Sequence, residues 1–109
     1  MAIYFLNTVL NEVGTTPVLL ASTSPSQTIT IIGLSLCNTS LQTIQASITL
    51  TDSSSTTGYY IKDVQIAPSS SLRVVNGGER LVLASSNSLY AVSNLAASMD
   101  VIVSYAEQV

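Results

Sequence analysis

Apolar and polar residues alternate along much of the chain, and the alternation is clearest in residues 43–51. Ile44, Ala46, Ile48 and Leu50 occupy every second position, and Thr, Gln and Ser residues fill the positions between them. Successive side chains of a β-strand point to opposite faces of a sheet. This period of two therefore predicts a strand with one face in the core and one face in water.

A second strand-like run, residues 28–37, comes before it, and the polar turn at residues 38–42 lies between the two runs. We expect the two runs to form the hairpin around which the other strands are added. Within residues 28–37 the phase of the alternation changes next to Gly33, which predicts either a bulge or burial on both faces. The apolar residues before the change are Ile29 and Ile31, and those after it are Ile32, Leu34 and Leu36.

The rest of the chain consists of shorter strand-like runs separated by clusters of turn residues. These runs cover residues 3–13, 17–22, 59–67, 72–75, 81–84, 89–92 and 99–106. We count about nine strands and find no helical pattern of ten residues and no connection long enough for a crossover helix. The sequence predicts one all-β domain over residues 1–109, an antiparallel β-sandwich of Ig-like or jelly-roll-like type. Residues 1–13 are predicted to be an N-terminal arm or an edge strand.

Two connecting segments have distinct signals. The segment Asn76-Gly77-Gly78-Glu79 predicts a hairpin turn, because Asn and Gly accept positive φ angles. Residues 52–58 form a Ser/Thr-rich loop without an apolar anchor, and we expect its tip to be exposed or bound to a partner.

Charged residues are only 8% of the chain, although 47% of its residues are hydrophobic. An ordinary soluble domain has about 25% charged residues. A weakly charged surface gives little repulsion between copies. When a neighbour covers it, few charged side chains lose their hydration. The net charge is −3 and the only cations are Lys62, Arg73 and Arg80, so we expect no nucleic-acid binding. No apolar stretch is long enough for a membrane-spanning helix, so we expect no membrane partner.

Catalysis is not expected from this set of residues. The chain has no His, which excludes the usual general base, the common nucleophile dyads and triads that use it, and the commonest zinc ligand. A Ser-Lys dyad on Lys62 is the one formal alternative, but Ile61 and Asp63 beside it indicate a solvated strand lysine. The acidic residues lie singly, without the spacing of a calcium loop or of a glycosidase pair. We predict no catalytic residue, no cofactor and no metal.

Three other features have a structural interpretation that is simpler than a functional one. Cys37 is alone, which fits folding in a reducing cytosol, and we expect it to be a small core residue at a strand end. The start of the chain has no basic region ahead of its apolar residues, so we expect no signal peptide. The triplet that begins at Asn38 matches a glycosylation sequon but is interpreted as turn chemistry. Tyr59 and Tyr60 are expected to place one ring inward and one at the rim.

The apolar residues near the N-terminus are the predicted interface. A domain of this size has too little interior for all of its apolar residues, and an uncovered apolar edge strand promotes aggregation. We therefore expect a second copy or another protein to cover part of residues 3–10. The candidate interface residues are Ile3, Tyr4, Phe5, Leu6, Val9 and Leu10.

Several strand-and-turn segments resemble small virion proteins of tailed bacteriophages. The segments are TTGYYIKDVQIAPSSSL at 56–72, LVL at 81–83, LYAV at 89–92 and IGLSLCNTS at 32–40. The resemblance implies a β-sandwich on the phage particle, most directly a capsid decoration (cement) protein that binds the major capsid protein or other virion proteins. It also implies assembly in the host cytoplasm, a place in the virion and a homo-oligomer, in several such phages a trimer.

Two other functions remain open from the sequence. The first is a tail or neck component of the particle. The second is a host-binding or carbohydrate-binding β-sandwich module, which could use Tyr59, Tyr90 or the loop at residues 52–58.

Overall fold

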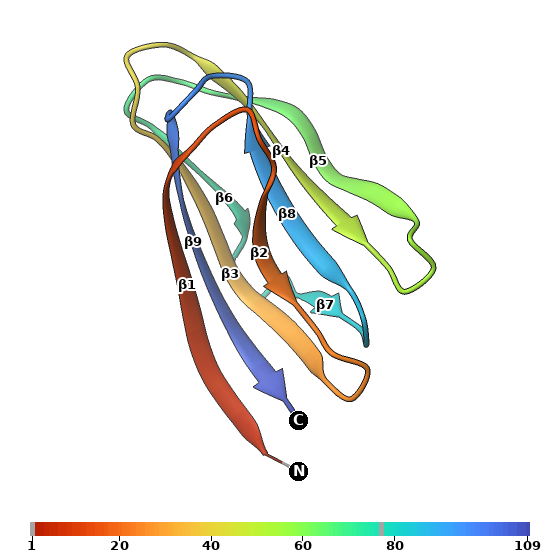
Figure 1. Cartoon of the computed structure of the whole chain (residues 1–109). Coiled ribbons are helices and arrows are strands. Elements are labelled where there is room, and N and C mark those ends of the chain that lie inside the picture. The colour runs from red at the N-terminus through yellow and green to blue at the C-terminus, as the bar shows by residue number, and fades with distance from the viewer. Residues whose placement is uncertain (1, 77) are drawn as a thin grey trace.

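The computed structural model describes residues 2–76 and 78–109, and in these residues it contains nine β-strands and no helix (Figure 1). This confirms the all-β prediction. The strands are β1 (Ile3–Val13), β2 (Val18–Ser22), β3 (Thr28–Asn38), β4 (Ile44–Thr51), β5 (Thr57–Ile66), β6 (Ser71–Val75), β7 (Leu81–Leu83), β8 (Ser88–Ser93) and β9 (Met99–Gln108).

The strands form two antiparallel sheets that pack face to face. Sheet A has the order β1-β9-β3-β6, with the short β7 also paired to β3, and sheet B has the order β2-β8-β4-β5. Most consecutive strands change from one sheet to the other, and in the part of the chain that the structure describes only β4 and β5 form a hairpin within one sheet. This strand order is that of a jelly roll, one of the two sandwich types that the sequence left open.

The predicted central hairpin is wrong, because β3 lies in sheet A and β4 lies in sheet B. Both strands have a largely apolar face, and in a sandwich two such faces can meet across the core as well as side by side. The alternation gives the face that is buried but not the neighbour to which the strand bonds.

The predicted hairpin between β6 and β7 is also wrong, since in the described residues both strands pair with β3 and not with each other. A turn does form there, because the N–H of Glu79 donates to the carbonyl of Asn76 (3.0 Å) and Gly78 has a φ of 100°. Gly77, part of the predicted turn, lies outside the described residues.

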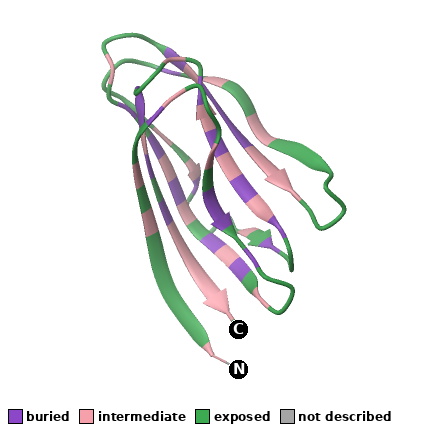
Figure 2. Ribbon diagram, in the orientation of Figure 1, coloured by how far each residue is buried: buried purple, intermediate pink, exposed green. Residues whose placement is uncertain are grey.

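The core lies between the two sheets and is built almost wholly from aliphatic side chains. As predicted, Ile44, Ala46 and Ile48 are fully buried, and Leu50 packs against the same cluster. Figure 2 shows the buried positions alternating along the central strands.

The change of phase in β3 is a bulge, one of the two predicted explanations. Ile31 pairs with Tyr105 and Gly33 pairs with Ser104, so Ile32 is an extra residue without a partner in the register. Leu34 therefore returns to the core, whereas Ile32 remains exposed on the outer face and does not share a face with Leu34.

Buried polar side chains join the loops at the end of the sandwich where β1 stops. The fully buried Asn38 donates from Nδ2 to the carbonyls of Gln42, Ile66 and Ala67, at 2.7 to 3.2 Å. Ser93 and Ser98 share a hydroxyl hydrogen bond of 2.7 Å. A buried polar group without such partners would cost stability, so these bonds fix the loops at this end.

Candidate assembly surface

Strand β1 forms one edge of sheet A and pairs along its length with β9. The register is regular from Ile3, opposite Gln108, to Leu10, opposite Val101, and it shifts only between Leu10 and Val13. Because β9 occupies one side of β1, the backbone groups on the other side are available to a further strand. β1 is thus an edge strand, one of the two predicted alternatives.

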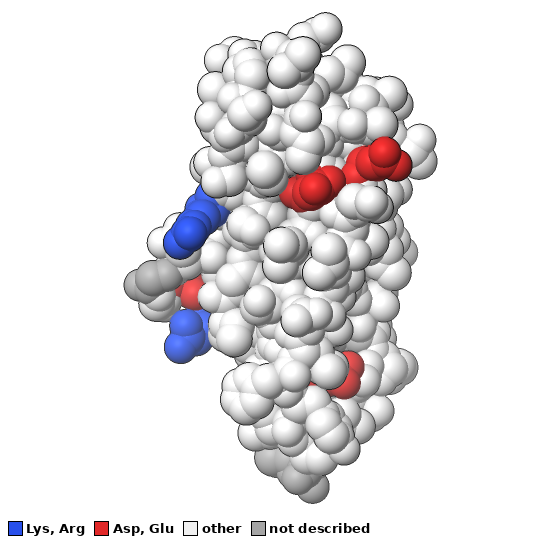
Figure 3. Space-filling view, turned by 90° about the vertical axis from the view of Figure 1, so that its left-hand side faces the viewer, with Lys and Arg blue, Asp and Glu red and all other residues white. Residues whose placement is uncertain are grey.

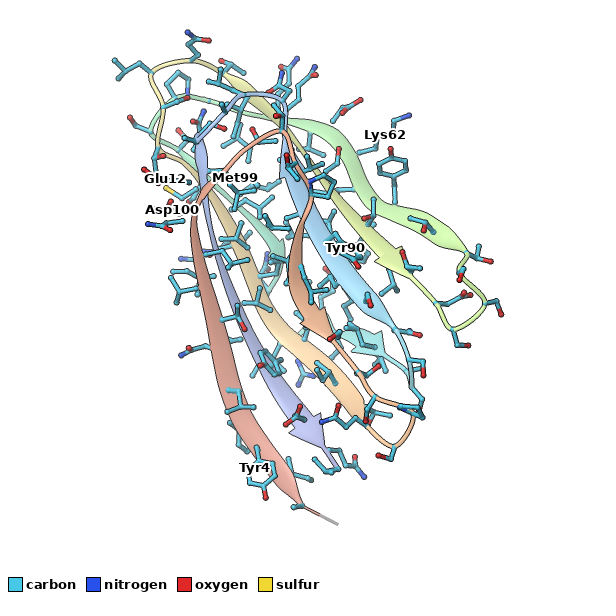
Figure 4. All side chains as sticks on the ribbon, in the orientation of Figure 1. Tyr4, Glu12, Lys62, Tyr90, Met99 and Asp100 are labelled. Carbon is cyan, nitrogen blue, oxygen red and sulfur yellow. The ribbon has the colours of Figure 1, made fainter. Side chains whose placement is uncertain are left out.

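Five of the six predicted interface residues are exposed on this strand, and the sixth, Leu10, is half-buried against the core. Phe5 and Val9 are 76% and 65% exposed. Figure 2 shows an almost continuous exposed stretch along the N-terminal half of β1, and Figure 4 shows Tyr4 near the free end of the strand.

The six residues divide between the two faces of sheet A, as their partners on β9 show. The outward-facing set is opposite Gln108, Ala106 and Ile102, and the inward-facing set is opposite Glu107, Tyr105 and Val101. The outward-facing residues are Ile3, Phe5 and Val9, and the inward-facing residues are Tyr4, Leu6 and Leu10.

The inward-facing residues near the N-terminus are exposed because sheet B does not extend over them. Strand β2, the edge of sheet B on this side, has five residues, whereas β1 has eleven. Figure 1 shows β1 reaching beyond the end of β2 toward the N-terminus. Tyr4 (53% exposed) and Leu6 (43% exposed) therefore lie on an inner face that has no opposite strand to cover it.

No charged side chain occurs on β1 before Glu12. Glu12 lies in the bulge at the end of the strand, with a φ of 54°, and its N–H donates to Asp100 Oδ1 on β9 (3.2 Å; Figure 4). Figure 3 shows this side of the molecule with wide uncharged areas between a few separate charged groups.

On the outer face of sheet A the apolar surface of β1 continues onto the neighbouring strands β9 and β3. Val9 lies opposite Ile102, which is also exposed, and beyond it the bulge of β3 leaves an open hollow of about 360 Å³. The hollow is lined by Ile32, Gly33, Leu34, Ser35, Arg73, Val75, Asn76, Ile102 and Ser104.

The other long edge strand, β5, is irregular and charged. Its register with β4 shifts twice, and Asp63 has a φ of 49°. The N–H of Asp63 donates to Ser47 Oγ (2.9 Å), and this hydroxyl lies 3.4 Å from Asp63 Oδ1, to which it donates. The exposed Lys62 is on the same strand, with its Nζ 5.1 Å from the centre of the Tyr59 ring, as expected for a solvated strand lysine.

The aromatic pair on β5 behaves as predicted, with Tyr59 exposed and Tyr60 partly buried against the core. Tyr60 donates its hydroxyl to Glu79 Oε2 (3.1 Å), and burial together with this acidic partner raises the pKa of Tyr60. An open hollow of about 300 Å³ lies beside the pair, lined by Leu50, Asp52, Thr56, Gly58, Tyr59 and Tyr60. Residues 52–58 are exposed, as predicted, although residues 57 and 58 already belong to β5.

Cys37 corrects one prediction, because it is exposed and not part of the core. Its neighbour Leu36 is fully buried, and adjacent strand residues point to opposite faces, so Cys37 points outward. In the described residues no three His, Cys, Asp or Glu side chains come close enough to hold a metal ion. The same part of the chain has no helix long and apolar enough to cross a membrane.

Some contacts at the end of the sandwich where β1 stops had no signal in the sequence. The approach of Glu12 to Asp100 joins residues 88 positions apart, and the pair Ser93 and Ser98 depends on the β8–β9 loop closing over the end of β1. Asn38 was identified only as a turn residue, whereas the structure shows it bonded to two loops.

No protein-family model and no curated protein matches the sequence. Among solved structures, the chain is similar to a protein of Bacillus endospore appendages, described as a novel family of disulfide-linked pili. The TM-score is 0.56 and the identity 11%, over 96% of this chain and 86% of that chain. This likeness supports the fold alone. A chain of infectious bursal disease virus, Gt strain, aligns with a TM-score of 0.48 and 13% identity over 97% of this chain and 32% of its own length.

Proposed function

We propose that the chain is a structural protein of a phage particle, most directly a capsid decoration protein that acts through its surfaces and catalyses no reaction. The observation that carries the proposal is the uncharged, largely exposed apolar edge strand β1. An isolated domain with such an edge tends to aggregate, so the presence of this edge fits a protein that works in an assembly. In this proposal the protein is part of the virion, and its partners are the major capsid protein and further copies of itself.

The weakly charged surface supports the same function. Only nine residues are charged, so contact with a particle would desolvate few charged side chains. The jelly roll, a fold common in viral capsid proteins and lectins, is compatible with this role but does not establish it.

A carbohydrate-binding module is the second candidate, and one observation favours it. Tyr59 is 59% exposed beside an open hollow that Asp52 and Thr56 also line, and sugar rings stack on exposed aromatic rings. Lys62 lies over the Tyr59 ring, however, and a sugar would have to displace it to use that face.

Quantitative mass spectrometry of purified particles distinguishes these functions. A decoration protein is expected in a copy number close to that of the major capsid protein, and a tail or neck component in a few copies per particle. As a direct test, purified protein is mixed with heads that lack it and the mixture is sedimented. Absence of the protein from intact particles, together with failure to sediment with heads, would contradict the proposal.

A further inference from the structure

From Ile3 to Leu10, strand β1 differs from the other sheet edges in having neither a charge nor a bulge that would prevent pairing. β2 follows Pro17 and has five residues, β6 is equally short and carries Arg73, and β7 has three residues. β5 is charged and bulged. Short length, charge and bulges are the usual means by which edge strands avoid pairing. Within residues 2–76 and 78–109 only β1 offers a long regular edge, so the matching edge on a second copy is its own β1.

We infer that β1 pairs with β1 of a second copy in an antiparallel arrangement, about a two-fold axis that passes through sheet A at Asn7. This inference rests on the proposed function, because it identifies the contact through which an assembling protein covers its apolar edge. It joins the two five-stranded sheets A into one continuous sheet.

Symmetry fixes most of this geometry. Two identical antiparallel strands in one sheet are related by an axis perpendicular to the sheet, which keeps the inner and outer faces of both copies on the same sides. Inward-facing residues then meet inward-facing residues, and one residue on the axis meets its own copy. The register is regular up to Leu10, so the axis falls near the middle of this stretch, at Leu6 or Asn7.

The side chains favour Asn7. With the axis there, Phe5 lies opposite Val9 of the second copy on the outer face, a favourable aromatic and β-branched pair. On the inner face Tyr4 lies opposite Leu10 of the second copy. No charged residue occurs between Ile3 and Leu10, so the pairing brings no like charges together.

The arrangement also covers the part of β1 that sheet B leaves open. Leu10 packs against the core where sheet B covers β1, which is the closed end of the sandwich. Tyr4 is exposed beyond sheet B, at the open end. An antiparallel pair places each open end beside the closed end of the other copy. The exposed Tyr4 thereby gains Leu10 of the second copy as a direct neighbour. Leu6 lies opposite Thr8 and gains Leu6 and Leu10 of the second copy as diagonal neighbours, without any change in the fold.

Single-cysteine cross-linking tests the axis directly. In a Cys37→Ser background, which leaves no other thiol, Asn7→Cys places two sulfur-bearing residues opposite each other, with Cα atoms about 4.5–5.5 Å apart. The matched control, Val9→Cys, lies on the same face, but its two copies would be about 13 Å apart along the strands. We expect mild oxidation to give a covalent dimer of Asn7→Cys on a non-reducing gel and at least tenfold less of Val9→Cys.

Three results would overturn the inference. They are equal cross-linking at the two positions, stronger cross-linking of Leu6→Cys than of Asn7→Cys, and a wild-type protein that is monomeric at tens of micromolar. Binding to heads is measured on the same samples. A monomer that still binds heads contradicts the pairing but not the proposed function, and a cross-linked dimer in a protein absent from particles contradicts the function but not the pairing.

Discussion

The two long edge strands, β1 and β5, are similar in length but different in what they offer to a partner. β1 has eleven residues and β5 has ten, and each lies at the end of its sheet. β1 is regular up to Leu10 and uncharged up to Asn11, whereas β5 has adjacent charges at Lys62 and Asp63, two register shifts and a residue with positive φ. Length alone therefore does not decide whether an edge can pair, because charge and irregularity also matter.

The irregularity of β5 has an identifiable cause. Ser47 of β4 is a polar residue on the strand that pairs with β5, and its hydroxyl bonds both to the N–H and to the carboxylate of Asp63. These bonds hold the bulge in place and place a charge at the edge. On β1 the only bulge comes after Leu10, so the apolar half of the strand keeps an even edge.

The largest expected effect separates folding from association. Ile48 is fully buried on β4, the strand that supports β5, and Ile48→Ala should lower the free energy of unfolding by about 2–5 kcal/mol. Leu6→Ala, on the exposed part of β1, should lower the free energy of unfolding by much less. This is measured by urea unfolding of the monomer at low protein concentration. A cost near zero for Ile48→Ala would show that the register of β4 is wrong.

A charge on β1 should make this edge resemble β5. Val9→Lys places a cation beside an apolar residue of the second copy, and we expect the dissociation constant of the dimer to rise at least tenfold. Val82→Lys is the matched control, because Val82 is an exposed strand valine (56%) on β7. Circular dichroism should show both variants folded. Equal weakening by the two substitutions would mean that surface charge, and not the β1 edge, controls association.

Removing charge elsewhere should matter less. We predict that Asp52→Asn, Asp63→Asn and Asp100→Asn, made one at a time, leave binding to heads within about tenfold of the wild type, since no carboxylate is expected to act in a reaction. Co-sedimentation with heads measures this. Any turnover found in the wild-type protein and lost in one of these variants would contradict the absence of catalysis.

The smallest effect concerns Tyr60 on β5. Its pKa is raised in the folded protein by burial and by Glu79, so the neutral phenol is favoured on folding. This contribution is complete below pH 10, the ordinary pKa, and is lost as the pH rises through the raised pKa of the folded state. The urea concentration at the midpoint of unfolding should therefore decrease slightly as the pH is raised beyond 10. The decrease should be smaller in Tyr60→Phe. An unchanged pH dependence in Tyr60→Phe would rule out this group as the cause.

The sequence predicts the strands well because their determinants are local. β1 was predicted with the bounds that the structure has, and the β4 core residues were correct, since a period of two directly gives the buried face. The phase change in β3 also located a bulge, because an inserted residue must shift the alternation.

The pairing of the strands could not be predicted in the same way. The alternation of β3 and β4 is the same whether they pair side by side or pack across the core, and the hairpin predicted between them does not exist. The network around Asn38 depends on loops brought together by the whole fold, and the contact of Glu12 with Asp100 depends on the pairing of β1 with β9. The candidate interface was identified because uncharged apolar residues on one strand are a local feature, but its edge position and its division between two faces required the structure.

Sedimentation of the wild-type protein over a range of concentrations tests the central claim, that β1 is an edge covered by another copy. We predict a reversible dimer that is populated at tens of micromolar and dissociates on dilution. A monodisperse monomer throughout this range would contradict it.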